Sequence, residues 1–446
     1  MALIGCLVYL TLPKTGPRAA ALSRPDTHHR ERTREVTMMS TPVWIAGVGM
    51  TPFGIHKNKS VNDLARWAIE DAARDAGAAL SDVDAAFFGS ATQGFLQGQA
   101  MIGGELALRE AGLQGIPVFN VENACATGAS AFALAVNHIR AEAGDIALVV
   151  GVEKMHIDNP DRSMAVFDTA YDVSDPEALA RTLKELGGDL DEPDLGRRSI
   201  FMDIYAAMAR NHMRLYGTTP EQIAAVSAKN HAHAVGNPRA HYRKLMTVEQ
   251  VLGARKLSHP LTVPMCAPLT DGAAAVVLCN KAGLRRLGAE RPVRVLAAVV
   301  GTGTDRDITT FEGHLSGRVS TRAYAAAGLG PSDVDVAEVH DATAFAEVLQ
   351  TEQLGLIPPG EGGPAAARGE TTLGGRIPIN PSGGLESKGH PIGASGLGQI
   401  FELTEQLRGS ATDRQVDGAR VALAENGGGF HRGEEAVTSV VILGKD

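Results

Sequence analysis

The sequence predicts an α/β fold made of two similar halves, and three observations lead to this class. Patterns typical of buried strands alternate with helical patterns from residue 41 onward. Short motifs recur in the same order in the second half of the chain. Two glycine-rich segments, residues 121–130 and 383–395, each precede a stretch that predicts a central helix. Such alternation predicts a mainly parallel sheet with helices on both faces.

Residues 1–40 lack any such pattern. They combine an apolar stretch too short to span a membrane with scattered charges, which predicts a disordered extension. A transit peptide, or an upstream start codon with Met38 or Met39 as the working initiator, would each account for this segment. The folded part then begins with a buried strand at residues 43–49 and an amphipathic helix that starts at Ser60.

The first glycine-rich segment lies between a predicted strand and a predicted helix. A strand pattern at residues 116–121 leads to Cys125, and the small, apolar residues 126–136 predict a buried helix directly after it. Another buried strand is predicted at residues 146–151. Residues 158–255 are more polar and charged, and we interpret them as an inserted helical region.

Two short motifs occur twice. Residues 80–87 recur as residues 331–338, an offset of 251 positions. The tripeptide Gly-Ala-Ser at residues 128–130 recurs at residues 393–395, an offset of 265. The common order and similar offsets indicate two homologous halves, each with a turn before its central helix.

We place these halves at residues 41–290, which include the insertion, and 291–446, and each half supplies one reactive side chain. Cys125 lies at a strand-to-helix turn, where free N–H groups and the helix dipole favour the thiolate. His390, in the equivalent turn of the second half, is the base that would activate it. The remaining cysteines are interpreted as small buried residues: Cys6, Cys266 and Cys279.

Composition narrows the classes of function. The formal net charge of −9 gives no electrostatic footprint for nucleic acid, although a local basic patch could bind an anionic substrate. Hydrophobic residues make up 44% and charged residues 21%, which is typical of a globular protein without a membrane span. The four cysteines have no paired spacing, which argues against disulfides and structural zinc. We therefore expect a reducing, cytoplasmic location and no bound metal.

Four motifs resemble those of the thiolase family, in particular its sterol-carrier-protein branch and lipid-transfer-like bacterial relatives. The motifs are Asn123-Ala124-Cys125-Ala126-Thr127-Gly128, Asp271-Gly272-Ala273-Ala274-Ala275, His340-Asp341-Ala342-Thr343-Ala344-Phe345, and Asn380-Pro381-Ser382-Gly383-Gly384 leading into Gly389-His390-Pro391. The resemblance covers residues 42–444. It implies a five-layered α-β-α-β-α fold of two pseudo-symmetric halves with an inserted loop domain. It also implies a homodimeric or tetrameric acyltransferase that acts on acyl-coenzyme A.

The resemblance assigns roles to individual residues. Cys125 would attack the thioester carbonyl and hold the acyl group, and His390 would take the thiol proton. His390 and His340 would bind the thioester oxyanion, although many thiolases have an asparagine-containing motif in place of His340. Backbone N–H groups of Cys125 and of the run Gly427, Gly428 and Gly429 would form a second oxyanion site. Equally, His340 could be an ordinary strand-end histidine and the glycine run a tight turn.

The chain departs from the family two residues before this glycine run. Thiolases of the biosynthetic type have a second cysteine there, which shuttles the proton at the α-carbon, whereas an ungapped match puts Glu425 at that place. A buried carboxylate with a raised pKa can act as a general base, so Glu425 is a candidate. A surface role is equally open for Glu425, and Asp341 and His431 are weaker alternatives.

Three functions stay open. The leading one is a thiolase that forms or cleaves a 3-ketoacyl-coenzyme A through a cysteine thioester. The second is a retro-aldolase for a steroid or lipid side-chain thioester, paired with a small zinc-ribbon and OB-fold accessory protein. The third is a non-catalytic lipid carrier. We expect no cofactor, because coenzyme A is part of the substrate. Four side chains of the insertion would line the acyl pocket or simply pack between helices: Met202, Tyr205, Met208 and Met213.

Overall fold

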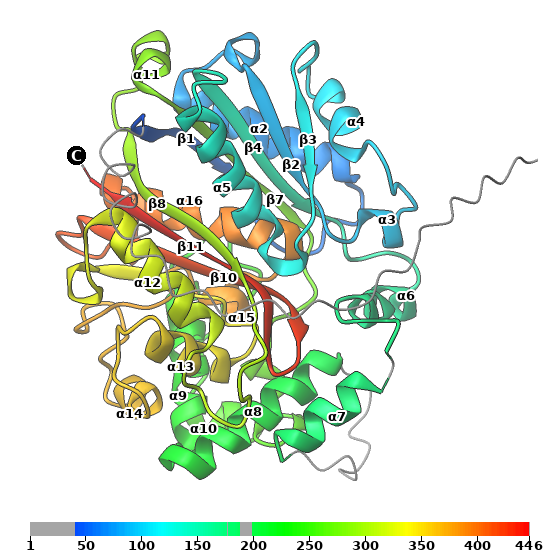
Figure 1. Ribbon diagram of the computed structural model, residues 1–446, viewed down its shortest axis with the longest axis vertical. Helices are drawn as coiled ribbons and strands as arrows, with labels where there is room; N and C mark the ends of the chain where they lie inside the picture. Colours follow the sequence, from blue (N-terminus) through cyan, green and yellow to red (C-terminus); the bar gives the residue numbers. More distant parts are fainter. Residues whose placement is uncertain (1–40, 176, 188–198, 446) are drawn as a thin grey trace, which may run out of the picture. The chain divides into compact units, whose positions relative to one another are not determined.

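The structure is a computed structural model that describes residues 41–175, 177–187 and 199–445 (Figure 1). The predicted disordered extension, residues 1–40, lies outside this part of the chain, and so does Cys6. The strands are β1 (Val43–Met50), β2 (Ala85–Gly89), β3 (Val118–Val121), β4 (Ile146–Glu153), β5 (Lys256–Ser258), β6 (Leu261–Thr262), β7 (Gly272–Cys279), β8 (Val293–Thr302), β9 (Val336–Glu338), β10 (Val421–His431) and β11 (Glu434–Gly444).

The helices follow the same chain order. The α-helices are α2 (Val61–Ala76), α3 (Gln93–Leu96), α4 (Gly103–Glu110), α5 (Thr127–Arg140), α6 (Pro160–Ala165), α7 (Ala178–Glu185), α8 (Ile200–Tyr216), α9 (Pro220–Val235), α10 (Val248–Leu252), α11 (Lys281–Leu287), α12 (Leu315–Ala327), α13 (Ala344–Gln353), α14 (Gly362–Ala367), α15 (Gly384–Lys388) and α16 (Ser395–Arg408). The 3₁₀ turns are η1 (Leu80–Asp82), η2 (Ala124–Ala126), η3 (Val166–Thr169), η4 (Val263–Met265), η5 (Pro331–Asp333), η6 (Ile392–Ala394) and η7 (Thr412–Arg414).

Side-chain caps set the start of the longer helices. The predicted helix at Ser60 is α2: the Ser60 hydroxyl oxygen accepts from the Asp63 N–H, and Asp63 accepts from the Ser60 N–H in return. Thr219 and Gln222 form the same reciprocal pair at the start of α9. Each pair satisfies two N–H groups that would otherwise lack a partner, which stabilises a helix start at that residue.

Within the described residues, nine strands form one mixed sheet in the order β3-β2-β4-β7-β1-β8-β11-β10-β9. The predicted parallel pairing is found for β3-β2-β4 and for β10-β9, whereas the inner pairs are antiparallel. β10 and β11 are antiparallel because only Arg432 and Gly433 separate them, which makes a hairpin. β1 and β8 pair over three residues only. This short pairing joins a first part of the sheet, β3 to β1, to a second part, β8 to β9.

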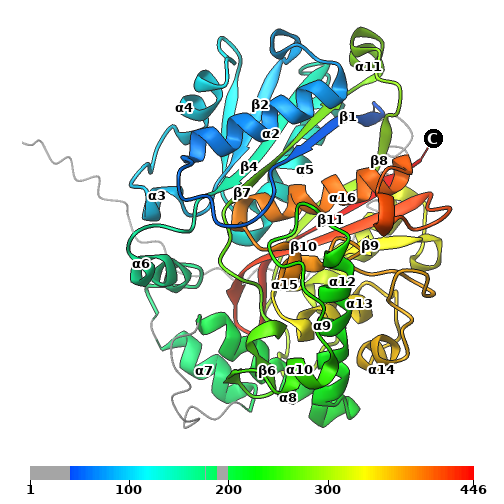
Figure 2. The same cartoon turned by 180° about the vertical axis from the view of Figure 1, so that it is seen from behind.

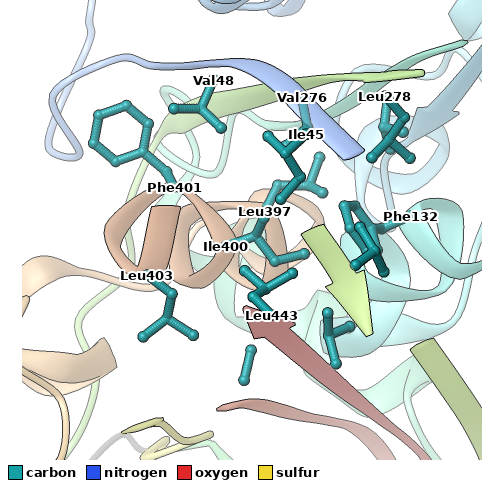
Figure 3. Packing of buried hydrophobic residues seen from close by; sticks show 14 of the residues in the cluster. Ile45, Val48, Phe132, Val276, Leu278, Leu397, Ile400, Phe401, Leu403 and Leu443 are labelled. Carbon is teal, nitrogen blue, oxygen red and sulfur yellow. The ribbon is translucent and has the colours of Figure 1, made fainter. Parts of the chain in front are cut away.

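These elements stack as five layers (Figures 1 and 2). Along β7, Val276 faces α5 and α16, whereas Val277 faces α2 and α4. Along β11, Val441 faces the same central helices, whereas Ile442 packs with α12. The central layer is therefore enclosed between both parts of the sheet, around residues such as Phe132 (Figure 3). The predicted α-β-α-β-α fold is confirmed.

The first repeated motif has the same local structure in both halves. It forms η1 before β2 and η5 before β9. Asp82 Oδ2 accepts from the Ala79 N–H at 2.9 Å, and Asp333 Oδ2 accepts from the Gly330 N–H at 2.8 Å. The recurring Ser-Asp-Val sequence thus encodes a capped turn that leads into a strand.

The second repeat is not in structural register. Each half has a three-residue turn followed by a 14-residue helix, η2 with α5 and η6 with α16, and these units are 268 positions apart rather than 265. Cys125 lies within its turn, whereas His390 lies two residues before the other turn, which corrects the prediction of equivalent positions. The two turns are in close contact, since a Cβ on Gly128 would lie 2.6 Å from the Gly393 carbonyl oxygen.

The segment between β4 and β7 contains α6 to α10, drawn in green in Figure 1. α8 packs with α13 of the second half around Tyr205, Met208 and Phe345. This contact places the insertion next to the end of the sheet at which β10 turns into β11. Each helix in the described part of the chain is too short or too polar to cross a membrane.

Candidate active site

The structure brings Cys125 and His390 together. Cys125 lies in η2, between β3 and the N-terminal end of α5. His390 lies between α15 and η6, ahead of α16. The distance from Cys125 Sγ to His390 Nε2 is 3.2 Å. The two central helices, which meet at their N-terminal ends, therefore place a thiol and an imidazole within hydrogen-bonding distance.

Hydrogen bonds around His390 determine which ring nitrogen carries the proton. The Ser395 hydroxyl donates to the Pro391 carbonyl oxygen at 3.1 Å, so its oxygen is left to accept from His390 Nδ1–H at 2.6 Å. The Nε2 of a neutral His390 then has a free lone pair beside the Cys125 thiol. This tautomer suits a base, and Ser395 is the residue that orients it.

His340 follows β9, and its ring centroid lies 5.2 Å from that of His390. The Asn426 Nδ2 donates to His340 Nδ1 at 3.0 Å, so the neutral ring carries its proton on Nε2. Burial lowers the pKa of His340 to about 3, which keeps the ring neutral near pH 7. His340 therefore offers a fixed N–H donor, the kind of group that stabilises an oxyanion.

The reacting pair is neutral at rest. Burial raises the pKa of the Cys125 thiol to about 12; the Glu153 carboxylate adds to this effect, and the Gly429 N–H opposes it. Burial and the neighbouring His340 lower the pKa of His390 well below its usual value. The raised pKa of the Cys125 thiol argues against the expected resting thiolate, because burial disfavours the charged form. The thiol proton has to pass to His390 during the attack.

The glycine run forms the wall beside the Cys125 turn. A Cβ on Gly428 would lie 2.4 Å from the Asn123 carbonyl oxygen, so only glycine fits where β10 meets this turn. Gly429 has a left-handed φ of +61°, and its N–H hydrogen-bonds the Cys125 sulfur. The N–H groups of Gly429 and of Cys125 itself both interact with the sulfur, which fits the predicted second oxyanion site.

The candidates for the α-carbon base lie in different places. Glu425 is fully buried, which excludes the surface role, and its Oε2 accepts from the backbone N–H of His340 at 3.0 Å. Burial and the nearby Glu435 raise the pKa of Glu425 to about 8. Glu425 and Asp341 are both absent from the lining of the cavity described below. His431 is exposed and lines a separate depression.

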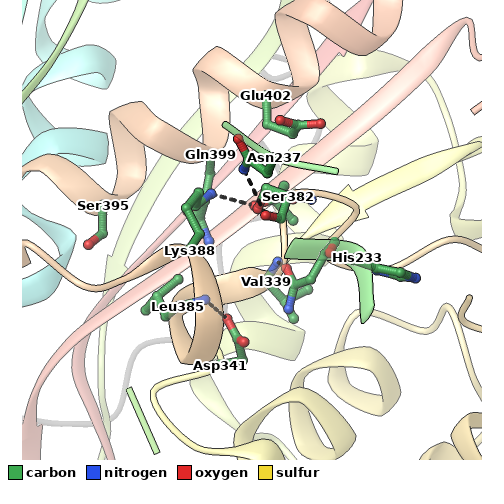
Figure 4. Close-up of polar contacts among 12 residues, drawn as sticks. His233, Asn237, Val339, Asp341, Ser382, Leu385, Lys388, Ser395, Gln399 and Glu402 are labelled. Carbon is green, nitrogen blue, oxygen red and sulfur yellow. Dashed lines mark hydrogen bonds and ion pairs between the residues drawn. The ribbon is translucent and has the colours of Figure 1, made fainter. Parts of the chain in front are cut away.

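A buried polar network supports the loop that carries His390 (Figure 4). Asp341 Oδ1 accepts from the Leu385 N–H at 2.7 Å, near the start of α15. Lys388, at the end of that short helix, pairs with Glu338 at 2.8 Å. These contacts tie both ends of α15 to β9 and the residues after it. Asp341 is thereby a structural acceptor.

Cys125, His340 and His390 line a cavity of about 510 Å³. Its wall is mainly apolar and includes Met164, Phe167, Phe201, Met202, Tyr205 and Phe430. Met202 and Tyr205 thus line the cavity, which is one of the two placements expected from the sequence. Met208 is buried in the packing between helices.

Polar and sulfur-containing groups line the rest of the cavity. The exposed cationic side chains on its wall are Arg243, Lys244 and Arg255. Cys266, interpreted from sequence as a structural residue, also contributes to the lining. The Sγ of Cys125 and one nitrogen each of His340 and His390 lie within 4.8 Å of one another, a donor set that could hold a thiophilic ion such as Zn²⁺.

Sequence reasoning missed several residues of the site. The sequence indicates Ser395 only as part of a repeat and indicates no role for Asn426. Glu153 was not considered, although it ends β4 and accepts from the Gly393 N–H at 3.2 Å, close to the Cys125 turn. A carboxylate at the end of an apolar buried strand was the available signal.

Comparisons with known proteins agree with the motifs. The family described as "Thiolase, N-terminal domain" matches residues 43–257, and "Thiolase C-terminal domain-like" matches residues 302–445. Acetyl-CoA acetyltransferase of Methanothermobacter thermautotrophicus is 38% identical, over 87% of this chain and 96% of its own length. Sterol carrier protein 2 of Bos taurus is 36% identical, over 86% of this chain and 69% of its own length. A solved structure, "Ltp2-ChsH2(DUF35) aldolase", has a TM-score of 0.73 at 24% identity, covering 92% of this chain and 99% of its own, which supports the fold alone.

Proposed function

The chain belongs to the thiolase family and is an acyltransferase of the thiolase type, and we propose that it forms or cleaves a 3-ketoacyl-coenzyme A through an acyl thioester on Cys125. One observation carries the proposal: Cys125 Sγ lies 3.2 Å from His390 Nε2 at the wall of a cavity of about 510 Å³. Covalent acyl transfer requires a nucleophile and a base at this separation, whereas a lipid carrier requires neither.

The geometry supports a two-step reaction. In the first step, His390 takes the Cys125 proton while the sulfur attacks the thioester carbonyl, and the N–H groups of Cys125 and Gly429 stabilise the oxyanion. Coenzyme A leaves as a thiolate, takes the proton from His390, and the acyl group stays on Cys125. In the second step, a base in the cavity takes an α-proton from another acyl-coenzyme A, and the resulting enolate carbon attacks the acyl group while the enolate oxygen accepts from His340 Nε2–H. Cleavage of a 3-ketoacyl-coenzyme A is the reverse.

The cavity supports an acyl-coenzyme A as the substrate. Arg243, Lys244 and Arg255 supply cationic groups for phosphates, although the whole chain has a net charge of −9. The aromatic rings of Phe201 and Phe430, with centroids 5.4 Å apart, form an apolar surface for the acyl group.

Intact-mass spectrometry tests the proposal. We expect the protein mixed with acetyl-coenzyme A to gain one acetyl group, and Cys125→Ala to gain none. Cys266→Ala is the matched control, because it removes the other thiol of the cavity and should keep the adduct. Failure of the unmodified chain to form an adduct with acetyl-, octanoyl- or phenylacetyl-coenzyme A would contradict acyl transfer.

A retro-aldol cleavage is the second candidate. It is favoured by Glu425 at the position where biosynthetic thiolases have a second cysteine. Such a reaction needs no acyl-cysteine, so cleavage of a 3-hydroxyacyl-coenzyme A that persists in Cys125→Ala would select it. A non-catalytic lipid carrier would show neither the adduct nor cleavage.

The proposal also covers the oligomeric state, the cellular location, the cofactor and the accessory protein. We propose a homodimer or tetramer, because β3 is an edge strand of the sheet and exposes 44% of Phe119, next to a loop that exposes 78% of Met101. Light scattering on the purified chain tests the assembly. We also propose a cytoplasmic location, no cofactor apart from the coenzyme A of the substrate, and a zinc-ribbon and OB-fold accessory protein for the retro-aldol alternative.

A further inference from the structure

Glu435 is a carboxylate on the cavity wall that the sequence did not indicate. It lies on β11 and lines the same cavity as Cys125, His340 and Gly428. Only 1% of its surface is exposed. A buried carboxylate is costly unless it is paired or used, so its surroundings need an explanation.

The glycine run makes room for this side chain. Glu435 pairs with Phe430 across the hairpin of β10 and β11. Its methylene groups lie over Gly427, where a Cβ would be 2.6 Å from Glu435 Cγ. A side chain at position 427 would therefore exclude Glu435 from this place. The run Gly427 to Gly429 thus serves two purposes, contact with the Cys125 turn and space for a carboxylate.

One oxygen of Glu435 is held and the other lacks a hydrogen bond. Oε1 accepts from the Gln350 side chain at 3.0 Å. Oε2 has no hydrogen-bond partner among the described residues, and His314 Nε2 is 3.5 Å away. The N–H of Ser316 donates to His314 Nδ1, so His314 carries its proton on Nε2 and presents a neutral N–H toward this oxygen.

The adjacent Glu434 is a structural carboxylate, and its hydrogen-bond partners can be compared with those of Glu435. It forms an ion pair with Arg306 at 2.6 Å and accepts from the N–H groups of Thr304 and Leu315, each at 3.0 Å. Glu434 is satisfied by partners within the chain, whereas Glu435, whose side chain lines the cavity, has a buried Oε2 without a hydrogen bond among the described residues.

We propose that Glu435, rather than Glu425, removes and returns the proton on the α-carbon of the substrate. This inference rests on the proposed thiolase reaction. The α-carbon C–H bond breaks, its proton moves to Glu435, and its electron pair forms an enolate whose oxygen is bound by His340 Nε2–H. In cleavage, protonated Glu435 returns the proton to the enolate carbon that leaves. Burial raises the pKa of Glu435 to about 7, which suits a group that works in both directions.

Two other groups are rivals for this role. Glu425 is absent from the lining of the cavity and is hydrogen-bonded to the backbone of His340. Cys266 lines the cavity, but burial raises the pKa of its thiol, and the thiol donates to the Thr262 carbonyl oxygen at 3.6 Å. Glu425 Oε1 and Glu435 Oε2 both lack a hydrogen-bond partner among the described residues, and of these two carboxylates only Glu435 lines the cavity.

The experiment measures two half-reactions separately in Glu435→Gln, Glu425→Gln and Cys266→Ala. Acylation of Cys125 by acetyl-coenzyme A is followed by intact mass, and exchange of the α-protons with D₂O is followed by NMR. We expect Glu435→Gln to keep the acylation rate within about threefold and to lose exchange by about 100-fold or more. The other two variants should keep exchange within about tenfold. Glu435→Asp, which shortens the side chain by one methylene, should lower exchange without preventing acylation.

The outcomes separate this inference from the proposed function. Loss of acylation in the unmodified chain defeats the proposed function. If the unmodified chain is acylated normally but does not exchange the α-protons of its substrate, the inference alone is overturned. Exchange that survives in both Glu435→Gln and Glu435→Asp also overturns the inference alone. Loss of exchange in Glu425→Gln or Cys266→Ala, with Glu435→Gln active, assigns the proton transfer to that rival. If Glu435→Gln does not fold, the Glu435→Asp result decides in the same way.

Discussion

The Cys125 turn and the His390 loop are placed by different means. The Cys125 turn contacts β10 through backbone groups, where a Cβ on Gly428 would lie 2.4 Å from the Asn123 carbonyl oxygen. The His390 loop is held by buried side chains, including the ion pair of Lys388 with Glu338 at 2.8 Å. The nucleophile thus depends on backbone shape and the base on a side-chain network. Adding a side-chain atom near the Cys125 turn should therefore displace the nucleophile. Removing a single hydrogen bond near the His390 loop should displace the base.

The largest effect is expected when the base itself is removed. His390→Ala leaves the Cys125 thiol, whose pKa is raised to about 12, without an acceptor for its proton. We expect the acylation rate to fall by about 10³-fold, within the usual range for general-base catalysis. Quenched-flow measurement of coenzyme A release checks this. A loss smaller than tenfold would show that another group accepts the proton.

Adding one methyl group at the Cys125 turn should have the next largest effect. Gly428→Ala forces β10 and the turn apart, and a displacement of the sulfur by about 1 Å can lower a rate by about 100-fold. Gly54→Ala is the matched control, since a Cβ there meets nothing within 4 Å. Acylation rates of the two variants are compared. Equal rates would mean that the close contact at Gly428 does not position the nucleophile.

Local signals were sufficient to predict the Cys125 turn. The strand at residues 116–121 and the small residues after Cys125 predicted β3 and α5 nearly at their observed bounds. The small residues of α5 reflect its burial, whereas β3 is an edge strand that exposes Phe119 and Asn120. The meeting of Cys125 and His390 was predicted from the repeat, although the actual offset between the two turn-helix units is 268. A repeat thus identifies related elements without placing each side chain.

Features that depend on tertiary contacts could not be predicted. The protonation of Cys125 depends on burial within a cavity whose walls come from distant segments. Glu435 reaches the site only because β10 and β11 pair Phe430 with it and because Gly427 leaves space. Neither the register of that hairpin nor the burial of the thiol is encoded in a local pattern.

A pair of serine substitutions sharpens the comparison between the two segments. Ser395→Ala leaves His390 Nδ1–H without its acceptor, which costs about 1 to 3 kcal/mol and favours the wrong tautomer. We expect acylation to slow by roughly 10- to 100-fold, with KM little changed. Ser130→Ala, which removes the acceptor of the Asn123 side chain at 2.9 Å, should slow it less. A larger effect in Ser130→Ala would reverse the proposed division between backbone and side-chain positioning.

The smallest effect on the reaction, and a clear one on stability, is expected for Glu425→Gln. Burial raises the pKa of Glu425 from 4.5 to about 8, so in the folded state this group holds its proton over a range where the unfolded chain has lost it. Its contribution to stability is therefore fully present below pH 4.5 and is lost as the pH rises to about 8. Glutamine can still accept from the His340 N–H and never ionises.

Urea unfolding at pH 5 and pH 8.5 checks this sign. The free energy of unfolding of Glu425→Gln, relative to the unmodified chain, should increase between these two values by about 1 to 4 kcal/mol. An unchanged difference would mean that Glu425 is ionised in the folded protein. A buried anion would then accept from the His340 backbone N–H, and the placement of His340 would depend on the charge of Glu425 as well as on hydrogen bonds.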